Sequence, residues 1–75
     1  MFEKVKEILM SELQIDEELI KMDAALASDL GVNSLELAEL VLLVEDQLNV
    51  EIDEDDLHKF ITVGDVVNYL EEISK

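Results

Sequence analysis

The chain has 75 residues, of which 49% are hydrophobic and 33% charged, and its 20 acidic and 5 basic residues give a formal net charge of −15. This is the composition of a globular domain rather than of a disordered chain. The acidity excludes nucleic-acid binding of the usual electrostatic kind and argues against adsorption to anionic membranes, because both require a basic surface. With no cysteine, disulfides and thiolate metal sites are also excluded.

Residues 1–75 are expected to form one domain, since no linker rich in proline, glycine or serine interrupts them. The longest apolar run, residues 40–44, is far too short to span a membrane, and the first residues do not resemble a signal peptide. We therefore expect a cytoplasmic monomer without membrane insertion. So short a chain seldom encloses a catalytic cavity, which favours a module that is bound or modified over an enzyme.

Hydrophobic periodicity predicts a first amphipathic helix over residues 2–14. A long connection follows over residues 15–33, with one helical turn near residues 16–20. The next helix is predicted to run from Ser34 to about Leu48. Asn33 is its expected N-cap, and Glu36 is placed to complete a capping box. Asn49 is suited to end this helix.

The remaining chain predicts two further helices. Residues 50–53 are too short and too charged for a strand, and residues 53–59 can form a short helix. Thr62 and Asp65 repeat the capping-box signal, and a final helix is predicted from Val63 to the C-terminus. The expected fold is therefore all-α, a small antiparallel four-helix bundle of three main helices and one short helix.

The helix that starts at Ser34 has more apolar residues than one buried face needs. At about 100° per residue, one stripe is expected to face the core: Leu37, Leu40, Val41, Val44 and Leu48. Leu35 and Leu42 fall nearly opposite, and Leu43 is also predicted to point outward. Between Met22 and His58 there are eleven acidic residues and no lysine or arginine. We interpret the outer face as a docking surface for a basic partner, made of Leu35, Glu36, Glu39, Leu42, Glu45 and Asp46.

Ser34 is the candidate for chemical modification. It lies in the first turn of this helix, where the positive end of the helix dipole favours a phosphate group. The chain has a single histidine, His58, and no base lies near Ser34 in the sequence, so Ser34 is not expected to be a catalytic nucleophile. A serine that accepts a group from another enzyme fits better. The acidic run at residues 53–56 lacks the glycine of a calcium-binding loop, so no metal site is predicted.

The segment Asp29-Leu30-Gly31-Val32-Asn33-Ser34-Leu35-Glu36-Leu37 closely resembles the attachment site of acyl carrier proteins. Residues 43–46, 51–52 and 62–70 are similar to that family as well, so the resemblance covers essentially the whole chain. It implies a non-catalytic carrier in fatty-acid or polyketide-type biosynthesis. It further implies that Ser34 bears a phosphopantetheine transferred from coenzyme A, whose thiol holds acyl groups as thioesters. The implied partners are a phosphopantetheinyl transferase and acyl-processing enzymes with basic docking surfaces.

Two departures from the family pattern stand out. The family usually has Asp before the serine and often Pro after the isoleucine, where this chain has Asn33 and Asp53. Two alternatives remain open at this point: an aminoacyl or D-alanyl carrier, and an acidic interaction module without a prosthetic group. If the chain sequesters an acyl group, the resemblance suggests a cavity lined by the apolar residues Leu40, Val44, Leu57, Phe60 and Ile61.

Overall fold

Three α-helices and two short 3₁₀ helices form the fold in a computed structural model, which describes residues 1–74. In chain order they are α1 (Phe2–Glu12), η1 (Glu17–Leu19), α2 (Ser34–Leu48), η2 (Glu54–Lys59) and α3 (Val63–Ile73). The predicted all-α class, with three main helices and a minor one, is confirmed. The predicted turn near residues 16–20 corresponds to η1. Lys75, at the end of the predicted last helix, lies outside the described residues.

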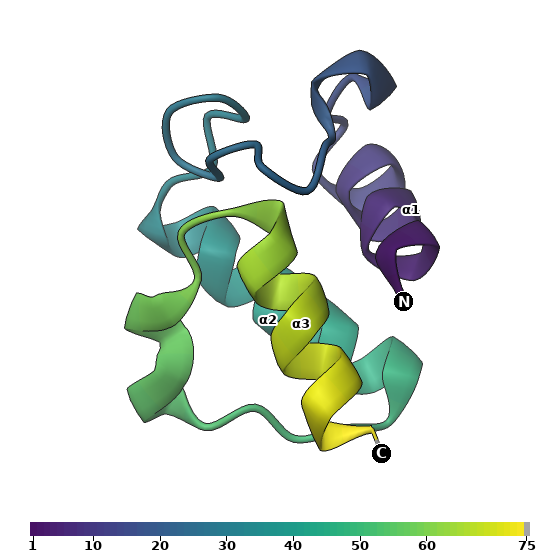
Figure 1. Ribbon diagram of the computed structural model, residues 1–75, viewed down its shortest axis with the longest axis vertical. Coiled ribbons are helices and arrows are strands. Elements are labelled where there is room, and N and C mark those ends of the chain that lie inside the picture. The colour runs from purple at the N-terminus through teal and green to yellow at the C-terminus, as the bar shows by residue number, and fades with distance from the viewer. Residues whose placement is uncertain (75) are drawn as a thin grey trace.

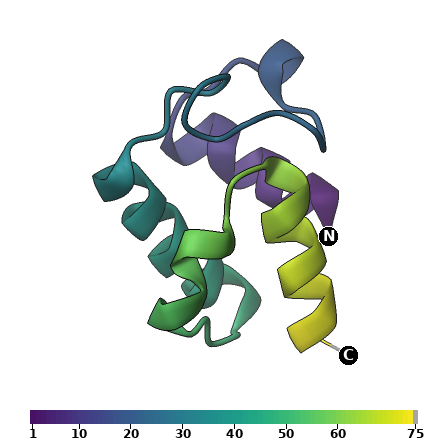
Figure 2. The ribbon, with the colours of Figure 1, turned by 60° about the vertical axis from the view of Figure 1, so that its left-hand side comes forward.

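The helices are not all antiparallel. Figures 1 and 2 show α2 and α3 running in the same general direction, whereas α1 runs against them. The prediction of antiparallel packing therefore holds for α1 but is wrong for α2 and α3. The cause is the connection over residues 49–62, which returns along the molecule through η2 and brings α3 to start at the same end as α2. No helix within residues 1–74 has the length and apolarity to cross a membrane.

The core is aliphatic and lies where the three main helices meet, with α1 packed against both α2 and α3. The helices contribute most of its fully buried side chains: Val5, Leu9, Leu40, Val44, Val63, Val67 and Leu70. The long connection between α1 and α2 also contributes anchors, since Ile20, Leu26 and Val32 are buried. That connection is therefore part of the folded body.

The two stripes of α2 are largely as predicted. Leu40, Val41 and Val44 are buried, and Leu37 and Leu48 pack against the core. Leu35 and Leu42 are 82% and 66% exposed. The outward placement predicted for Leu43 is wrong, because Leu43 is half-buried and packs against the core. Its position three residues after Leu40 places it beside the buried face of the helix.

Side-chain capping determines where α2 and α3 begin. Glu36 N–H donates to Asn33 Oδ1 at 2.8 Å, and Asn33 N–H donates to Glu36 Oε1 at 3.2 Å. Thr62 and Asp65 form the same reciprocal pair at the start of α3. Asn49, with φ 55°, ends α2 in the left-handed conformation. All three sequence predictions are confirmed, because each depends only on residues within one turn of the helix end.

Gly64 brings the start of α3 into close contact with the long connection. Gly64 N–H donates to the Met22 carbonyl oxygen at 2.8 Å, and a Cβ added at Gly64 would lie 2.8 Å from that oxygen. Gly64→Ala is expected to destabilise the fold by about 1–3 kcal/mol, since the clash involves backbone rather than a flexible side chain. Thermal unfolding measures the effect, with Gly31→Ala as a control for which no neighbouring atom is within 4 Å of the added Cβ. Because Gly31 has φ +71°, its variant reports the cost of backbone strain alone.

Asp65 couples the stability of α3 to pH. Its carboxylate accepts hydrogen bonds from Thr62 N–H at 3.0 Å and Ile61 N–H at 3.1 Å, and the Thr62 bond is the main cause of a lowered Asp65 pKa. A lowered folded pKa means that this stabilisation is complete above the unfolded value of 3.8 and is lost as pH falls through the folded pKa. The stability difference between the native chain and Asp65→Asn should therefore shrink below about pH 4 in denaturant titrations. A difference that stays constant down to about pH 2 would contradict this account.

Candidate attachment site and docking surface

The loop before α2 presents Ser34 at the surface. Val32 is buried, and its N–H donates to the Leu26 carbonyl at 2.8 Å. Leu26 N–H in turn donates to the Ile61 carbonyl at 2.9 Å, which ties this loop to the segment before α3. Gly31 takes the left-handed conformation that the turn requires. Ser34, two residues after the buried anchor, is exposed and begins α2.

The groups around Ser34 fit a phosphodiester. Within residues 1–74, the Ser34 hydroxyl makes no hydrogen bond, and the backbone N–H groups of Ser34 and Leu35 are without a partner. The capping box occupies the N–H groups on either side, those of Asn33 and Glu36. The free hydroxyl is therefore flanked by two free N–H donors at the positive end of a helix dipole, which suits phosphate oxygens. Phosphopantetheine, attached through its phosphate, would be held here by Ser34 and these two N–H groups.

Ser34 has no neighbour that would activate it as a nucleophile. A serine attacks by itself only when a base takes its proton, and no base is bonded to this hydroxyl in the described part of the chain. His58 lies exposed on η2, and its side chain makes no hydrogen bond in the described part of the chain. Within residues 1–74, Ser34 therefore lacks the bonded base that a catalytic serine needs. Among residues 1–74, no three His, Asp or Glu side chains gather in a way that could hold a metal ion.

The six residues predicted for the docking surface fall into two groups. Leu35, Glu39, Leu42 and Asp46 are exposed and recur every three or four residues, so they form one outward row along α2, which we call the docking stripe. Glu36 and Glu45 lie on either side of this row. The Glu36 carboxylate is bonded to Asn33 N–H, and the Glu45 carboxylate accepts from Ile52 N–H at 2.7 Å. Neither carboxylate is as free for a partner as Glu39 and Asp46 are.

The two lysines that form ion pairs within residues 1–74 do not neutralise the docking stripe. Lys59 pairs with Asp56 at 3.0 Å on η2, and Lys6 pairs with Glu17 at 3.0 Å between α1 and η1. The Lys59 ammonium and the Tyr69 hydroxyl lower the pKa of Asp56. Both ion pairs lie off α2, and exposed pairs of this kind contribute little to stability. The negative charge of the stripe therefore remains available to a partner.

A groove lies between α2 and η2, beside the docking stripe. Its volume is about 170 Å³, and it is lined by Ala38, Val41, Leu42, Glu45, Ile52, Glu54 and Leu57. We call it the α2–η2 groove. Of the five residues predicted to line a cavity, only Leu57 lines this groove. Leu40, Val44 and Phe60 are instead buried in the core, and Ile61 is 63% exposed, because the main core is closely packed where α2 meets the other helices.

The groove lies on the same face of α2 as Ser34. Ala38 and Leu42 follow Ser34 by four and eight residues, so the groove opens about 6 Å along α2 from the serine. Residue spacing alone could have indicated Ala38 and Leu42, since both share a helix face with Ser34. Ile52 and Glu54 could not have been found in this way, because they reach the groove from a different segment.

Comparison with known proteins agrees with this geometry. Residues 3–70 match the family model described as phosphopantetheine attachment site. Acyl carrier proteins of Campylobacter lari and Clostridium perfringens are 39% and 43% identical to the chain over 74 and 72 residues. These matches cover 99% and 96% of this chain, and 96% and 95% of the relatives. The acyl carrier protein of Campylobacter jejuni is 38% identical over 74 residues, covering 99% of this chain and 96% of the relative.

The chain belongs to the acyl carrier protein family, whose members carry a phosphopantetheine group. The predicted family and prosthetic group are thereby confirmed. The family consists of carriers and not of enzymes, which agrees with a serine that has no activating base. The alternative of an acidic module without a prosthetic group is excluded.

Proposed function

We propose that this chain carries acyl groups as thioesters on a phosphopantetheine arm attached to Ser34, in biosynthesis of the fatty-acid type. The observation that supports Ser34 most directly is its free, exposed hydroxyl at the start of α2, beside two free N–H groups. The arm supplies the thiol that forms the thioester, and the chain itself supplies the attachment point, the docking stripe and the α2–η2 groove. We further propose that residues 1–75 act as one carrier domain and as a monomer. The expected cytoplasmic location stays a prediction.

Attachment is tested by intact mass. The unmodified chain, incubated with coenzyme A and a phosphopantetheinyl transferase, should gain the mass of one phosphopantetheine, while adenosine 3′,5′-bisphosphate is released. The new bond joins the serine oxygen to phosphorus, and the hydroxyl proton is lost. Incubation without the transferase is the control and should give no gain, because no base in the chain activates the hydroxyl. A chain that stays unmodified with an active transferase and coenzyme A would argue against the proposal.

The partners are proposed to be the transferase and acyl-processing enzymes that present basic side chains around an apolar groove. Leu35 and Leu42 would be the apolar contacts, and Glu39 and Asp46 would attract the partner's lysine and arginine residues. Complementary charge of this kind acts mainly on the association rate and on its dependence on salt.

Glu39→Lys is expected to slow association with such a partner by about three- to tenfold at low salt and to weaken the salt dependence. Stopped-flow or surface-plasmon measurements with a carrier-dependent enzyme would give both values. Glu12→Lys on α1 is the matched control, because it changes the net charge equally at an exposed position off the docking stripe. Equal slowing by both variants would mean that total charge, and not the stripe, determines docking.

A further inference from the structure

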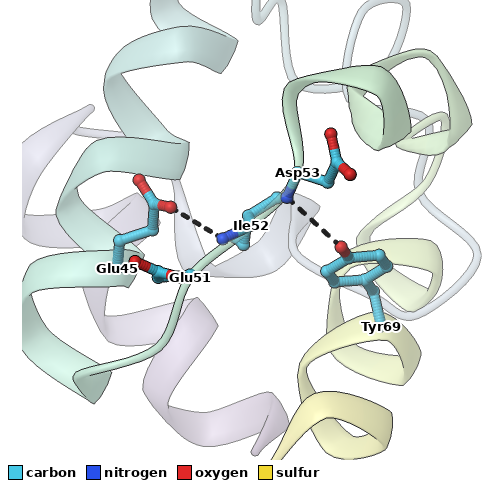
Figure 3. A pocket seen from close by; sticks show the side chains of 5 residues that line it. All are labelled: Glu45, Glu51, Ile52, Asp53 and Tyr69. Atoms are coloured by element: carbon cyan, nitrogen blue, oxygen red, sulfur yellow. Dashed lines mark hydrogen bonds between the residues drawn. The ribbon is translucent and has the colours of Figure 1, made fainter.

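Outside the helix caps, two carboxylates in the described part of the chain accept hydrogen bonds from backbone N–H groups. Glu45 accepts from Ile52 N–H at 2.7 Å, and Figure 3 shows this bond tying α2 to the segment before η2. Asp29 accepts from Ala25 N–H at 2.8 Å within the long connection. The second bond lies in the loop that leads into Ser34, so it bears on the attachment site.

Asp29 closes a turn between Ala25 and Leu30. While its carboxylate accepts from Ala25 N–H, the backbone N–H groups of Asp29 and Leu30 donate to the Ala25 carbonyl at 2.9 and 3.1 Å. Both backbone polar groups of Ala25 are thereby held by the far side of the turn. Across residues 25–32, all of which the structure describes, no other side chain makes a hydrogen bond. Asp29 is therefore the one side chain that fastens this turn by hydrogen bonding.

The turn lies between two buried anchors, Leu26 and Val32. Leu26 N–H donates to the Ile61 carbonyl at 2.9 Å, and the Leu26 carbonyl accepts from Val32 N–H at 2.8 Å. Residues 27–31 between the anchors, which we call the tip, are exposed or half-buried, so packing alone holds them weakly. Gly31 ends the tip and adds little restraint of its own, because glycine adopts either sign of φ. The conformation of the tip therefore depends on the hydrogen bonds of the turn.

We propose that Asp29 is a positioning residue for the modification of Ser34, because it keeps the tip in one conformation for the modifying enzyme. This inference rests on the proposed function, since it takes Ser34 to be the attachment residue. The tip adjoins Ser34 in the chain, so an enzyme that reaches the hydroxyl also contacts the tip. When the tip is already ordered, binding does not have to order it and is tighter. The capping box orders the start of α2 separately, so Asp29 acts on binding and not on the transfer step.

Steady-state transfer from coenzyme A by a phosphopantetheinyl transferase, at varied concentrations of the chain, tests this role. Asp29→Ala should raise the KM for the chain about three- to tenfold and leave kcat within about a factor of two. Asp29→Asn keeps a side-chain oxygen that accepts the same N–H, so it should restore most of the native KM. Both variants remove the same charge. Equal KM values for the two variants would mean that charge and not the hydrogen bond matters, and a native KM in Asp29→Ala would equally overturn the proposal.

Asp23→Ala is the matched control on the same connection. Asp23 is exposed, lines the same hollow of about 320 Å³ as Asp29, and its carboxylate has no bonded partner in the described part of the chain. The substitution changes the net charge equally without removing a hydrogen bond, so it should keep the native KM. A rise in KM as large as that of Asp29→Ala would assign the effect to the charge of the connection and overturn the proposal.

Amide hydrogen exchange of the unmodified chain tests the turn without the transferase. Asp29→Ala should speed exchange of the Val32 amide about tenfold, because the loop beside its bond to Leu26 opens more often. Asp29→Asn should restore most of the protection. The Leu70 amide in the buried part of α3 reports global unfolding, and its exchange should change less than that of Val32. Unchanged exchange at Val32, or equal acceleration at Val32 and Leu70, would overturn the proposal.

These results and the mass test of the proposed function fail independently. All Asp29 variants should reach full modification at Ser34 given time, because only the rate at low concentration of the chain is expected to differ. A native chain that gains no mass would argue against the proposed function, whereas exchange at Val32 is measured with neither coenzyme A nor the transferase present.

Discussion

Ser34→Ala is expected to abolish uptake of phosphopantetheine completely while the chain folds normally. The hydroxyl is exposed and makes no hydrogen bond in the described part of the chain, so its removal should change the free energy of unfolding by less than about 0.5 kcal/mol. The variant should show no mass gain with coenzyme A and a phosphopantetheinyl transferase. Its thermal unfolding should match that of the native chain, which shows that loss of modification does not follow from loss of structure.

Two of the three other serines show why position, and not residue type, should decide the outcome. Ser11 lies inside α1, where its hydroxyl donates to the Glu7 carbonyl at 2.8 Å. Ser28 is exposed in the long connection and has no helix start behind it. Ser28→Ala is therefore the matched control, and it should be modified as fast as the native chain. Label that persists in Ser34→Ala would assign the attachment to another residue.

Leu40→Ala and Leu42→Ala should have opposite effects on stability and binding. Leu40 is 1% exposed in the core, so its truncation should cost about 2–5 kcal/mol of stability. For a domain of this size, that lowers the midpoint of thermal unfolding by on the order of 10 °C or more. Leu42 lies on the docking stripe, and its truncation should change stability by less than about 0.5 kcal/mol. It should weaken binding to a carrier-dependent enzyme by roughly 1–2 kcal/mol.

Both variants remove the same three carbon atoms from one helix, two residues apart, so they differ only in the face that they alter. Thermal unfolding and a binding titration on each variant give four values for comparison. Binding by Leu40→Ala is measured below its unfolding transition, so that the folded fraction does not enter the result. If Leu42→Ala were as destabilising as Leu40→Ala and left binding unchanged, the docking stripe would be assigned to the wrong face.

The helix starts and the exposed serine could be predicted from the sequence because they depend on neighbouring residues. Asn33 and Glu36 form their capping box across one helical turn, as Thr62 and Asp65 do. Asn49 ends α2 through its own backbone conformation. The first helix ends at Glu12, two residues before the predicted end, because Gln14 takes a positive φ of 56°. Nothing in the apolar periodicity of residues 2–14 marks that turn.

The tertiary structure decided what depends on segments distant in sequence. Leu43 is covered because it borders a face that other elements bury, and a helical wheel does not show those elements. The Glu45 carboxylate accepts a hydrogen bond from a backbone N–H seven residues on, so a residue that its acidity assigned to docking also ties α2 to the segment before η2. Gly64 is needed because Met22 approaches it from another part of the chain. The sequence by itself thus determined the helices, their caps and the candidate serine, since these form within a turn or two, whereas the α2–η2 groove exists only after the packed helices bring separate segments together.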